Sequence, residues 1–191
     1  MKLIYNLQTE KIILGIDPGT TIMGFGIIKI IKKQMYFVLM DELILNKYDN
    51  HYLRLKKIFE RTTQLIDTYN PDEIAIESPF FGKNVQSMLK LGRAQGVAMA
   101  AGLSKEITIT EYAPKKIKMA ITGNGTASKE QVAKMLKSIL NLKTLPKNLD
   151  ATDGLAAAVC HFYNQGKITT NKSYSGWGSF VKQNKTRIKN K

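Results

Sequence analysis

Runs of β-branched and other apolar residues alternate with short polar turns between residues 11 and 45. Residues 11–17, 24–31 and 35–45 each predict a strand, and the turns between them predict a three-stranded meander. Apolar residues then recur at helical spacing over residues 51–70, where Asn70-Pro71 ends the pattern. This part of the chain predicts three strands followed by an amphipathic helix.

Strands and helices continue to alternate after residue 70. Short strands are predicted over residues 72–80 and 107–113, with a helix of small residues over 84–103 between them. Residues 128–131 have the S-x-x-Q form of a capping box ahead of an apolar stripe, and residues 150–164 predict a last helix. The alternation predicts an α/β fold, in which a central sheet is flanked by helices.

Length and composition suggest one domain with a basic extension. The 191 residues, 43% of them hydrophobic, suit a single domain, which we expect over residues 1–165. Residues 166–191 hold seven Lys or Arg and no acid, which predicts a flexible basic tail. The net charge of +14 makes nucleic acid the leading partner class. No apolar run is long enough for a spanning helix, so no membrane partner is expected.

The cysteine and histidine content limits the compartment and the metal chemistry. The N-terminal residues lack the pattern of a secretory signal, and Cys160 is the only cysteine, so we expect a cytoplasmic protein without disulfides. One cysteine and two separated histidines leave no zinc-binding arrangement. Any metal here would have oxygen ligands.

Acidic residues stand where two of the predicted strands end. Asp17 closes the first strand and Glu77 closes the strand in IAIES, while Asp150 and Asp153 open the last helix at a spacing that puts both on one face. Each has an ordinary explanation: turn hydrogen bonds for Asp17, solvent or a lysine for Glu77, helix capping and the helix dipole for the two aspartates. If the strands that end in Asp17 and Glu77 are neighbours in the centre of the sheet, their ends instead bring the acids together at one edge of the sheet.

Four adjacent carboxylates repel one another unless cations neutralise them. Mg²⁺ is the natural cation for such oxygen ligands, and two ions would activate water for attack at phosphorus and stabilise the leaving 3′ oxygen. The sequence therefore predicts Asp17, Glu77, Asp150 and Asp153 as both metal ligands and catalytic residues. We expect two Mg²⁺ per site, with Mn²⁺ as a substitute, in an enzyme that cuts a nucleic acid backbone.

Four motifs, GIDPGTT, AIESPF, KLGRAQGV and DATDGLAAAVCH, occur in this order and closely resemble those of the RuvC family of Holliday junction resolvases. The resemblance covers about residues 11–164. It implies a ribonuclease H-like fold with a mixed sheet, and a homodimeric Mg²⁺-dependent endonuclease acting in DNA recombination and repair. The resemblance further implies paired symmetrical nicks across a four-way junction that leave 5′-phosphate and 3′-hydroxyl ends. It also implies the RuvAB branch-migration complex as a partner. The four acids match the family's metal ligands, although some members have histidine in place of Asp150.

The resemblance also implies DNA-binding residues. Phe80 matches an aromatic residue that stacks on bases near the crossover, and Phe81 lies beside it. Lys118 and Lys129 match lysines that contact the DNA backbone, whereas Lys115 and Lys116 add local charge. Ordinary packing of one phenylalanine and ordinary solvation of the lysines are the alternatives.

Two other functions fit part of the pattern. A non-cleaving junction-binding protein would need the basic residues but not the four acids. GIDPGTT also resembles the phosphate motif of ATP-binding proteins of the sugar kinase and actin superfamily, but those need a second motif on a duplicated domain that 191 residues cannot hold. The acids favour the nuclease.

Overall fold

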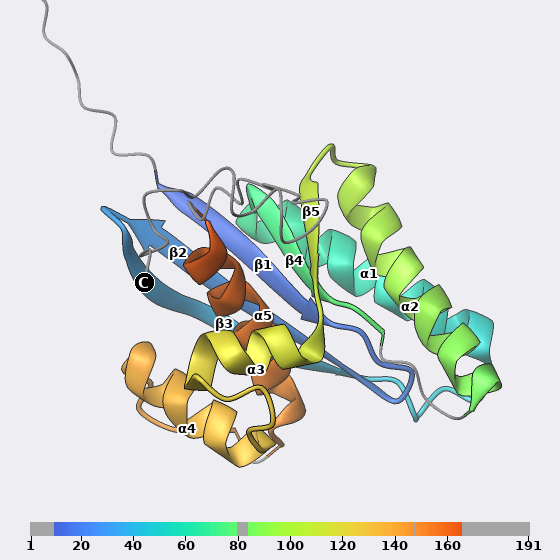
Figure 1. Ribbon diagram of the computed structural model, residues 1–191. Helices are drawn as coiled ribbons and strands as arrows, with labels where there is room; N and C mark the ends of the chain where they lie inside the picture. Colours follow the sequence, from blue (N-terminus) through green and yellow to red (C-terminus); the bar gives the residue numbers. More distant parts are fainter. Residues whose placement is uncertain (1–9, 80–83, 147, 166–191) are drawn as a thin grey trace, which may run out of the picture.

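The computed structural model describes residues 10–79, 84–146 and 148–165 (Figure 1). Its strands are β1 (Lys11–Asp17), β2 (Ile22–Ile31), β3 (Gln34–Ile44), β4 (Glu73–Glu77) and β5 (Thr108–Tyr112). Its helices are α1 (His51–Tyr69), α2 (Val85–Leu103), α3 (Pro114–Thr122), α4 (Lys129–Ile139) and α5 (Asp150–Asn164). Within these ranges, no helix is long and apolar enough to cross a membrane.

The five strands form one mixed sheet in the order β3-β2-β1-β4-β5. β1 pairs with β2, and β2 with β3, in antiparallel fashion, which confirms the predicted meander. β4 lies parallel to β1 and to β5. β1 and β4 are therefore neighbours, and their carboxyl ends lie at the same edge of the sheet.

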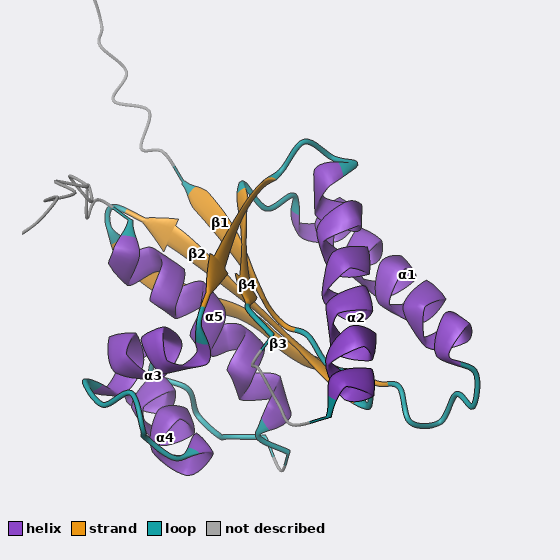
Figure 2. Ribbon diagram, turned by 45° about the vertical axis from the view of Figure 1, so that its right-hand side comes forward, coloured by secondary structure: helices purple, strands orange, loops and turns teal. Residues whose placement is uncertain are grey.

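Helices cover both faces of the sheet, in three layers (Figures 1 and 2). Leu14, Ile16, Ile74 and Ile76 lie in a buried cluster with α1 and α2. Ile13 and Ala75, at the alternate positions, lie in a second cluster with α3, α4 and α5. Because side chains alternate along a strand, Asp17 and Glu77 face the second layer, where α5 lies.

The predicted elements agree with the structure to within a few residues, with one omission. The capping box is present, since Ser128 accepts from the backbone of Gln131 and the Gln131 side chain accepts from the backbone of Ser128. Helix α3 was not predicted. Its signals are weak: Pro114 stands at its start, and Ile117 and Ile121 are its only buried residues.

Helix α5 lies directly on the sheet. A Cβ atom on Gly15 would lie 2.1 Å from the carbonyl oxygen of Gly154 and 2.5 Å from the backbone nitrogen of Ala158. A Cβ on Gly24 would lie 2.3 Å from the carbonyl oxygen of Asp150. The absence of side chains at these glycines lets the backbone of α5 contact β1 and β2.

Helix α5 is also covered on a second side, by α3. Cys160 faces α3, where its Sγ lies 3.9 Å from the carbonyl oxygen of Lys116. The apolar residues of α5 therefore pack against two different neighbours, the sheet and α3.

Candidate active site

Asp17 and Glu77 are the last residues of the neighbouring strands β1 and β4. Both lie on the face covered by α5, as their positions in the alternating pattern require. Among the described residues, no hydrogen bond holds the carboxylate of Asp17. The turn hydrogen bonds offered as the ordinary explanation for Asp17 are therefore absent from this part of the chain.

The first turn of α5 supplies the other two acids. Leu149 is the N-cap of α5, so Asp150 is the first helical residue and does not cap the helix. The ammonium of Lys129, at the start of α4, lies 2.6 Å from Oδ1 of Asp150 and 2.7 Å from Oδ2 of Asp153. One lysine thus joins both aspartates and fixes α4 beside α5.

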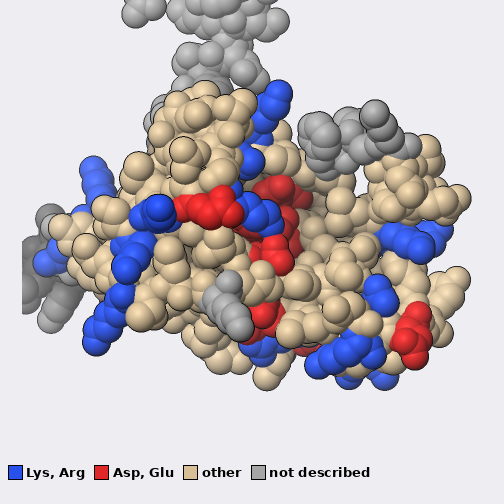
Figure 3. Space-filling model, turned by 90° about the horizontal axis from the view of Figure 1, so that it is seen from below, with Lys and Arg blue, Asp and Glu red and all other residues tan. Residues whose placement is uncertain are grey.

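Three of the four acids share one cavity of about 300 Å³. Its walls are formed by Asp17, Glu77, Pro114, Ile117, Lys118, Lys129, Val132, Asp153 and Ala156. Asp150 is not part of this wall and is connected to it through Lys129. Figure 3 shows Asp and Glu gathered near the middle of one face of the molecule, with Lys and Arg next to them and farther out on both sides.

The carboxylates raise one another's pKa values. Burial raises the pKa of Asp17 well above its usual value, and the charges of Glu77 and Asp153 raise it further. Burial and the charge of Asp153 raise the pKa of Glu77 to about 7. Burial also raises the pKa of Asp153, against the opposing effect of the Lys129 hydrogen bond. These shifts identify a site with an excess of negative charge.

Lys129 compensates part of this charge. Burial alone would lower its pKa, but the hydrogen bonds to Asp150 and Asp153 and the charges of both hold the pKa of Lys129 above its usual value. Lys118, on α3, lowers the pKa of Glu77 and of Asp153 through its charge. Two lysines therefore face at least three carboxylates across one cavity.

The donor set fits a divalent cation, although it is not arranged as a coordination shell. Within the described ranges, no three Asp, Glu, His or Cys side chains are already positioned to hold a metal ion. The ammonium of Lys129 bonds to two of the four acids in this arrangement. Carboxylate oxygens around one cavity, with pKa values raised by burial and by like charge, are nevertheless the donors that a hard divalent cation takes.

The remaining predicted residues are less closely tied to the cavity. Phe80 and Phe81 lie outside the described residues. Lys115 is exposed, and Lys116 places its ammonium 4.9 Å from the centre of the Tyr112 ring. Neither lysine belongs to the cavity wall, and their contact with DNA stays a prediction.

Two supporting residues were missed by the sequence analysis. The amide of Gln95 on α2 lies 3.4 Å from the carbonyl oxygen of Glu77 and donates to Oε2 of Glu111 at 2.8 Å. Arg54 on α1 donates to the carbonyl oxygen of Thr20, in the turn after Asp17, at 2.9 Å. The only sequence signal for either residue was that a polar side chain lies on an otherwise apolar or small-residue face of its helix.

The raised pKa of Glu77 predicts how stability depends on pH without divalent cations. Between the ordinary value of 4.5 and about 7 the folded protein binds more protons at Glu77 than the unfolded chain does. The free energy of unfolding should therefore fall as pH rises through this window. Because Mg²⁺ would bind the ionised carboxylates, it should raise the melting temperature more at pH 8 than at pH 5.

Thermal melts at both pH values, with and without Mg²⁺, measure this effect. A melting temperature shifts by roughly 2–4 °C for each kcal/mol in a chain of this size. The Glu77→Gln variant is the control, since it lacks the titrating group and should show a smaller decline with pH. Equal pH dependence in the variant and the wild type would contradict the assignment.

A mixed five-stranded sheet whose central strands end in acids, covered by a helix that begins with two more, defines a nuclease of the ribonuclease H-like class. A family model described as "Crossover junction endodeoxyribonuclease RuvC" matches residues 13–161. The chain belongs to this family.

Sequence and structural relatives support this assignment. The chain is 74% identical over 183 residues to the crossover junction endodeoxyribonuclease RuvC of Christiangramia forsetii, covering 96% of this chain and 95% of that protein. It is 60% identical to the protein of the same name from Bacteroides fragilis, covering 94% and 97%. A solved structure of Thermus thermophilus RuvC in complex with Holliday junction substrate has a TM-score of 0.74 at 28% identity, covering 80% of this chain and 93% of that one.

Proposed function

We propose that this chain resolves Holliday junctions by paired symmetrical nicks, in homologous recombination and DNA repair. The hydrolysis of phosphodiester bonds would leave 5′-phosphate and 3′-hydroxyl ends. The observation that carries the proposal is the meeting of acids from β1, β4 and α5 at one cavity. A net charge of +14 supports a polyanionic substrate. Membership of the RuvC family argues against the alternative function of an ATP-binding protein.

Asp17, Glu77, Asp150 and Asp153 are the residues that would hold the divalent cations, which we propose to be two Mg²⁺. Bound cations of this kind supply a nucleophilic water at neutral pH and stabilise the leaving oxygen. The strand ends fix the first two carboxylates and the first turn of α5 fixes the others. Because all four depend on backbone elements rather than on loops, the site is held rigidly.

The lysines beside the acids would hold the DNA backbone. Lys118 lines the cavity from α3 and Lys129 from α4, so a phosphate entering between them meets positive charge on two sides. Phe80, which follows Glu77 closely in the sequence, is proposed to stack on a base near the crossover, with Phe81 beside it. Lys115 and Lys116 would add to the attraction without touching the cut phosphate.

A homodimer would place two such sites on one junction. Helix α2 carries an exposed apolar stripe, in which Val85 is 65% exposed, Leu89 50% and Leu103 60%. Gly92 and Gly96 lie on the same helix, and a Cβ on either would meet nothing within 4 Å. Since no close packing among the described residues requires these glycines, we propose that this stripe meets its copy across a two-fold axis. The RuvAB partner and the cytoplasmic location stay predictions.

A cleavage assay with synthetic four-way junctions tests the function. We expect Mg²⁺-dependent nicks at symmetrical positions on two opposed strands, and little cutting of a linear duplex of the same sequence. Closed circular DNA that extrudes a cruciform should be linearised in one binding event, because a dimer makes both nicks. Tight junction binding without cutting under any divalent cation would support the non-cleaving alternative, and single nicks would contradict the dimer.

A further inference from the structure

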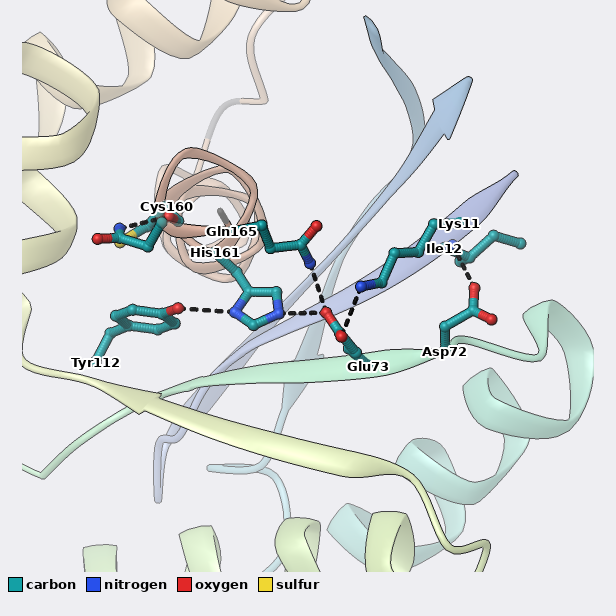
Figure 4. Close-up of polar contacts among 9 residues, drawn as sticks. Lys11, Ile12, Asp72, Glu73, Tyr112, Cys160, His161 and Gln165 are labelled. Atoms are coloured by element: carbon teal, nitrogen blue, oxygen red, sulfur yellow. Dashed lines mark hydrogen bonds and ion pairs between the residues drawn. The ribbon is translucent and has the colours of Figure 1, made fainter. Parts of the chain in front are cut away.

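A polar network extends from Tyr112, which pairs with Glu77 at the carboxyl end of β5, to Glu73 and Lys11, where β4 and β1 begin (Figure 4). The hydroxyl of Tyr112 lies 2.8 Å from Nδ1 of His161, and Nε2 of His161 lies 2.5 Å from Oε2 of Glu73. Lys11 Nζ lies 2.6 Å from Oε1 of the same glutamate, and the amide of Gln165 donates to Oε2 at 2.5 Å. Tyr112 is 4% exposed and His161 6%. None of these contacts has a role in the proposed chemistry.

The strands that contribute to this network are the strands that carry the acids. β1 begins with Lys11 and ends with Asp17. β4 begins with Glu73 and ends with Glu77. Each of these two strands therefore has one end in the network and the other end in the active site.

Helix α5 contributes a residue to the network, and α3 begins shortly after one. α5 has Asp153 in its first turn and His161 in its last. Tyr112 is the last residue of β5, two residues before α3 begins, and α3 carries Lys118. The carbonyl oxygen of Tyr112 also accepts from the backbone N–H of Ser78, next to Glu77, at 2.9 Å. The network thus reaches every element that supplies the cavity with an acid, and the helix that supplies Lys118.

Directional contacts of this kind fix positions that apolar packing leaves less defined. Both ring nitrogens of His161 have partners, and both oxygens of Glu73 have partners. Tyr112 and His161 are buried, so loss of the Tyr112 hydroxyl leaves Nδ1 of His161 without its partner, and their hydrogen bond strongly favours one arrangement. The network can therefore set the position of α5 and of the β5–α3 corner relative to β1 and β4.

We propose that Tyr112, His161 and Glu73 are positioning residues that hold the four acids and Lys118 in their mutual arrangement. This inference rests on the proposed function for the role of the acids. It assigns the three residues no contact with substrate or cations. Their effect on the site is transmitted through β1, β4, α5 and the start of α3.

Hydrogen exchange tests the proposal independently of activity. Tyr112→Phe removes one hydroxyl and leaves Nδ1 of His161 without its partner. We expect amides in the first turn of α5 and at Ser78 to exchange about tenfold faster, while amides of α1 keep their wild-type rates. Glu73→Gln, made in parallel, retains the size of the side chain and should show the same pattern of affected amides.

Ile58→Val is the matched control. Ile58 is fully buried on α1, a helix that carries none of the proposed acids, and the variant loses one methyl group. Its exchange should increase around α1 and not at the first turn of α5. Melting temperatures of all variants establish that each is folded under the conditions used.

Cation affinity and junction cleavage give the functional readouts. For Tyr112→Phe we expect about a tenfold rise in the Mg²⁺ concentration needed for half of the Mg²⁺-induced thermal shift, as is typical when support of metal ligands is lost. Junction affinity without Mg²⁺ should remain at the wild-type level. The same exchange rates and Mg²⁺ dependence in Tyr112→Phe as in Ile58→Val would overturn the positioning role. If the wild type cut no junction, the proposed function would fail. The exchange pattern would still decide whether the network positions the acids.

Discussion

Replacing Asp17 by asparagine is expected to abolish junction cleavage and leave junction binding intact. The carboxylate is half-buried at the end of β1 and faces Glu77 and Asp153 across the cavity. Its loss would remove a cation ligand, and cation-assisted stabilisation is worth several kcal/mol, or about 10³-fold in rate. Single-turnover cleavage with saturating protein and Mg²⁺ measures the rate, and a titration without Mg²⁺ measures affinity.

The stability of the Asp17→Asn protein separates a catalytic from a structural role. Burial and like charges raise the pKa of Asp17, so an uncharged asparagine should leave the melting temperature of the cation-free protein unchanged or raise it. Asp67→Asn is the control, since Asp67 lies on α1 in an exposed pair with Lys105. That variant should cut at the wild-type rate. A parallel loss of stability, binding and cleavage in Asp17→Asn would show that the residue supports the fold.

Gly15→Ala is expected to cause the largest loss of stability. The added Cβ would lie 2.1 Å and 2.5 Å from backbone atoms of α5, which no side-chain rotation can relieve. Overpacking of well-packed interiors costs about 1–3 kcal/mol, and a clash with helix backbone should reach or exceed roughly 3 kcal/mol. Since typical domains are stable by only about 5–15 kcal/mol, much of the protein's stability would be lost. Denaturant unfolding monitored by circular dichroism measures the change.

The same substitution on α2 provides the comparison. A Cβ on Gly92 would meet no described atom within 4 Å, and alanine favours a helix over glycine by up to about 1 kcal/mol. Gly92→Ala should therefore unfold at the same or a higher denaturant concentration, measured where the protein is monomeric. Equal destabilisation by Gly15→Ala and Gly92→Ala would contradict the close contact between α5 and β1.

The sequence predicted the strands and four of the five described helices because their signals are local. Alternation, helical spacing and caps determine these elements over short stretches, and Ser128 with Gln131 forms the expected capping box. Helix α3 was missed because its lysines were interpreted only as DNA contacts or local charge and its apolar residues are few. Short helices depend mainly on tertiary packing for their stability.

The candidate active site was also predicted only in part. Strand-end positions and the i, i+3 spacing sufficed to place Asp17, Glu77 and Asp153 at one cavity. The pairing of Lys129 with both aspartates was not predicted, because it depends on how α4 lies beside α5. The partners Tyr112 and His161 are 49 positions apart in the sequence, and no local pattern connects them.

The position of α5 in the chain has a consequence for biosynthesis. This helix packs on β1, β2, β3 and β4, yet the ribosome makes it after all five described strands. Contacts of such large sequence separation form late, since the intervening loop must close first. A nascent chain that ends before α5 exposes the apolar face of its sheet and lacks Asp150 and Asp153. The four proposed cation ligands can therefore meet only after nearly all of the described residues have been translated.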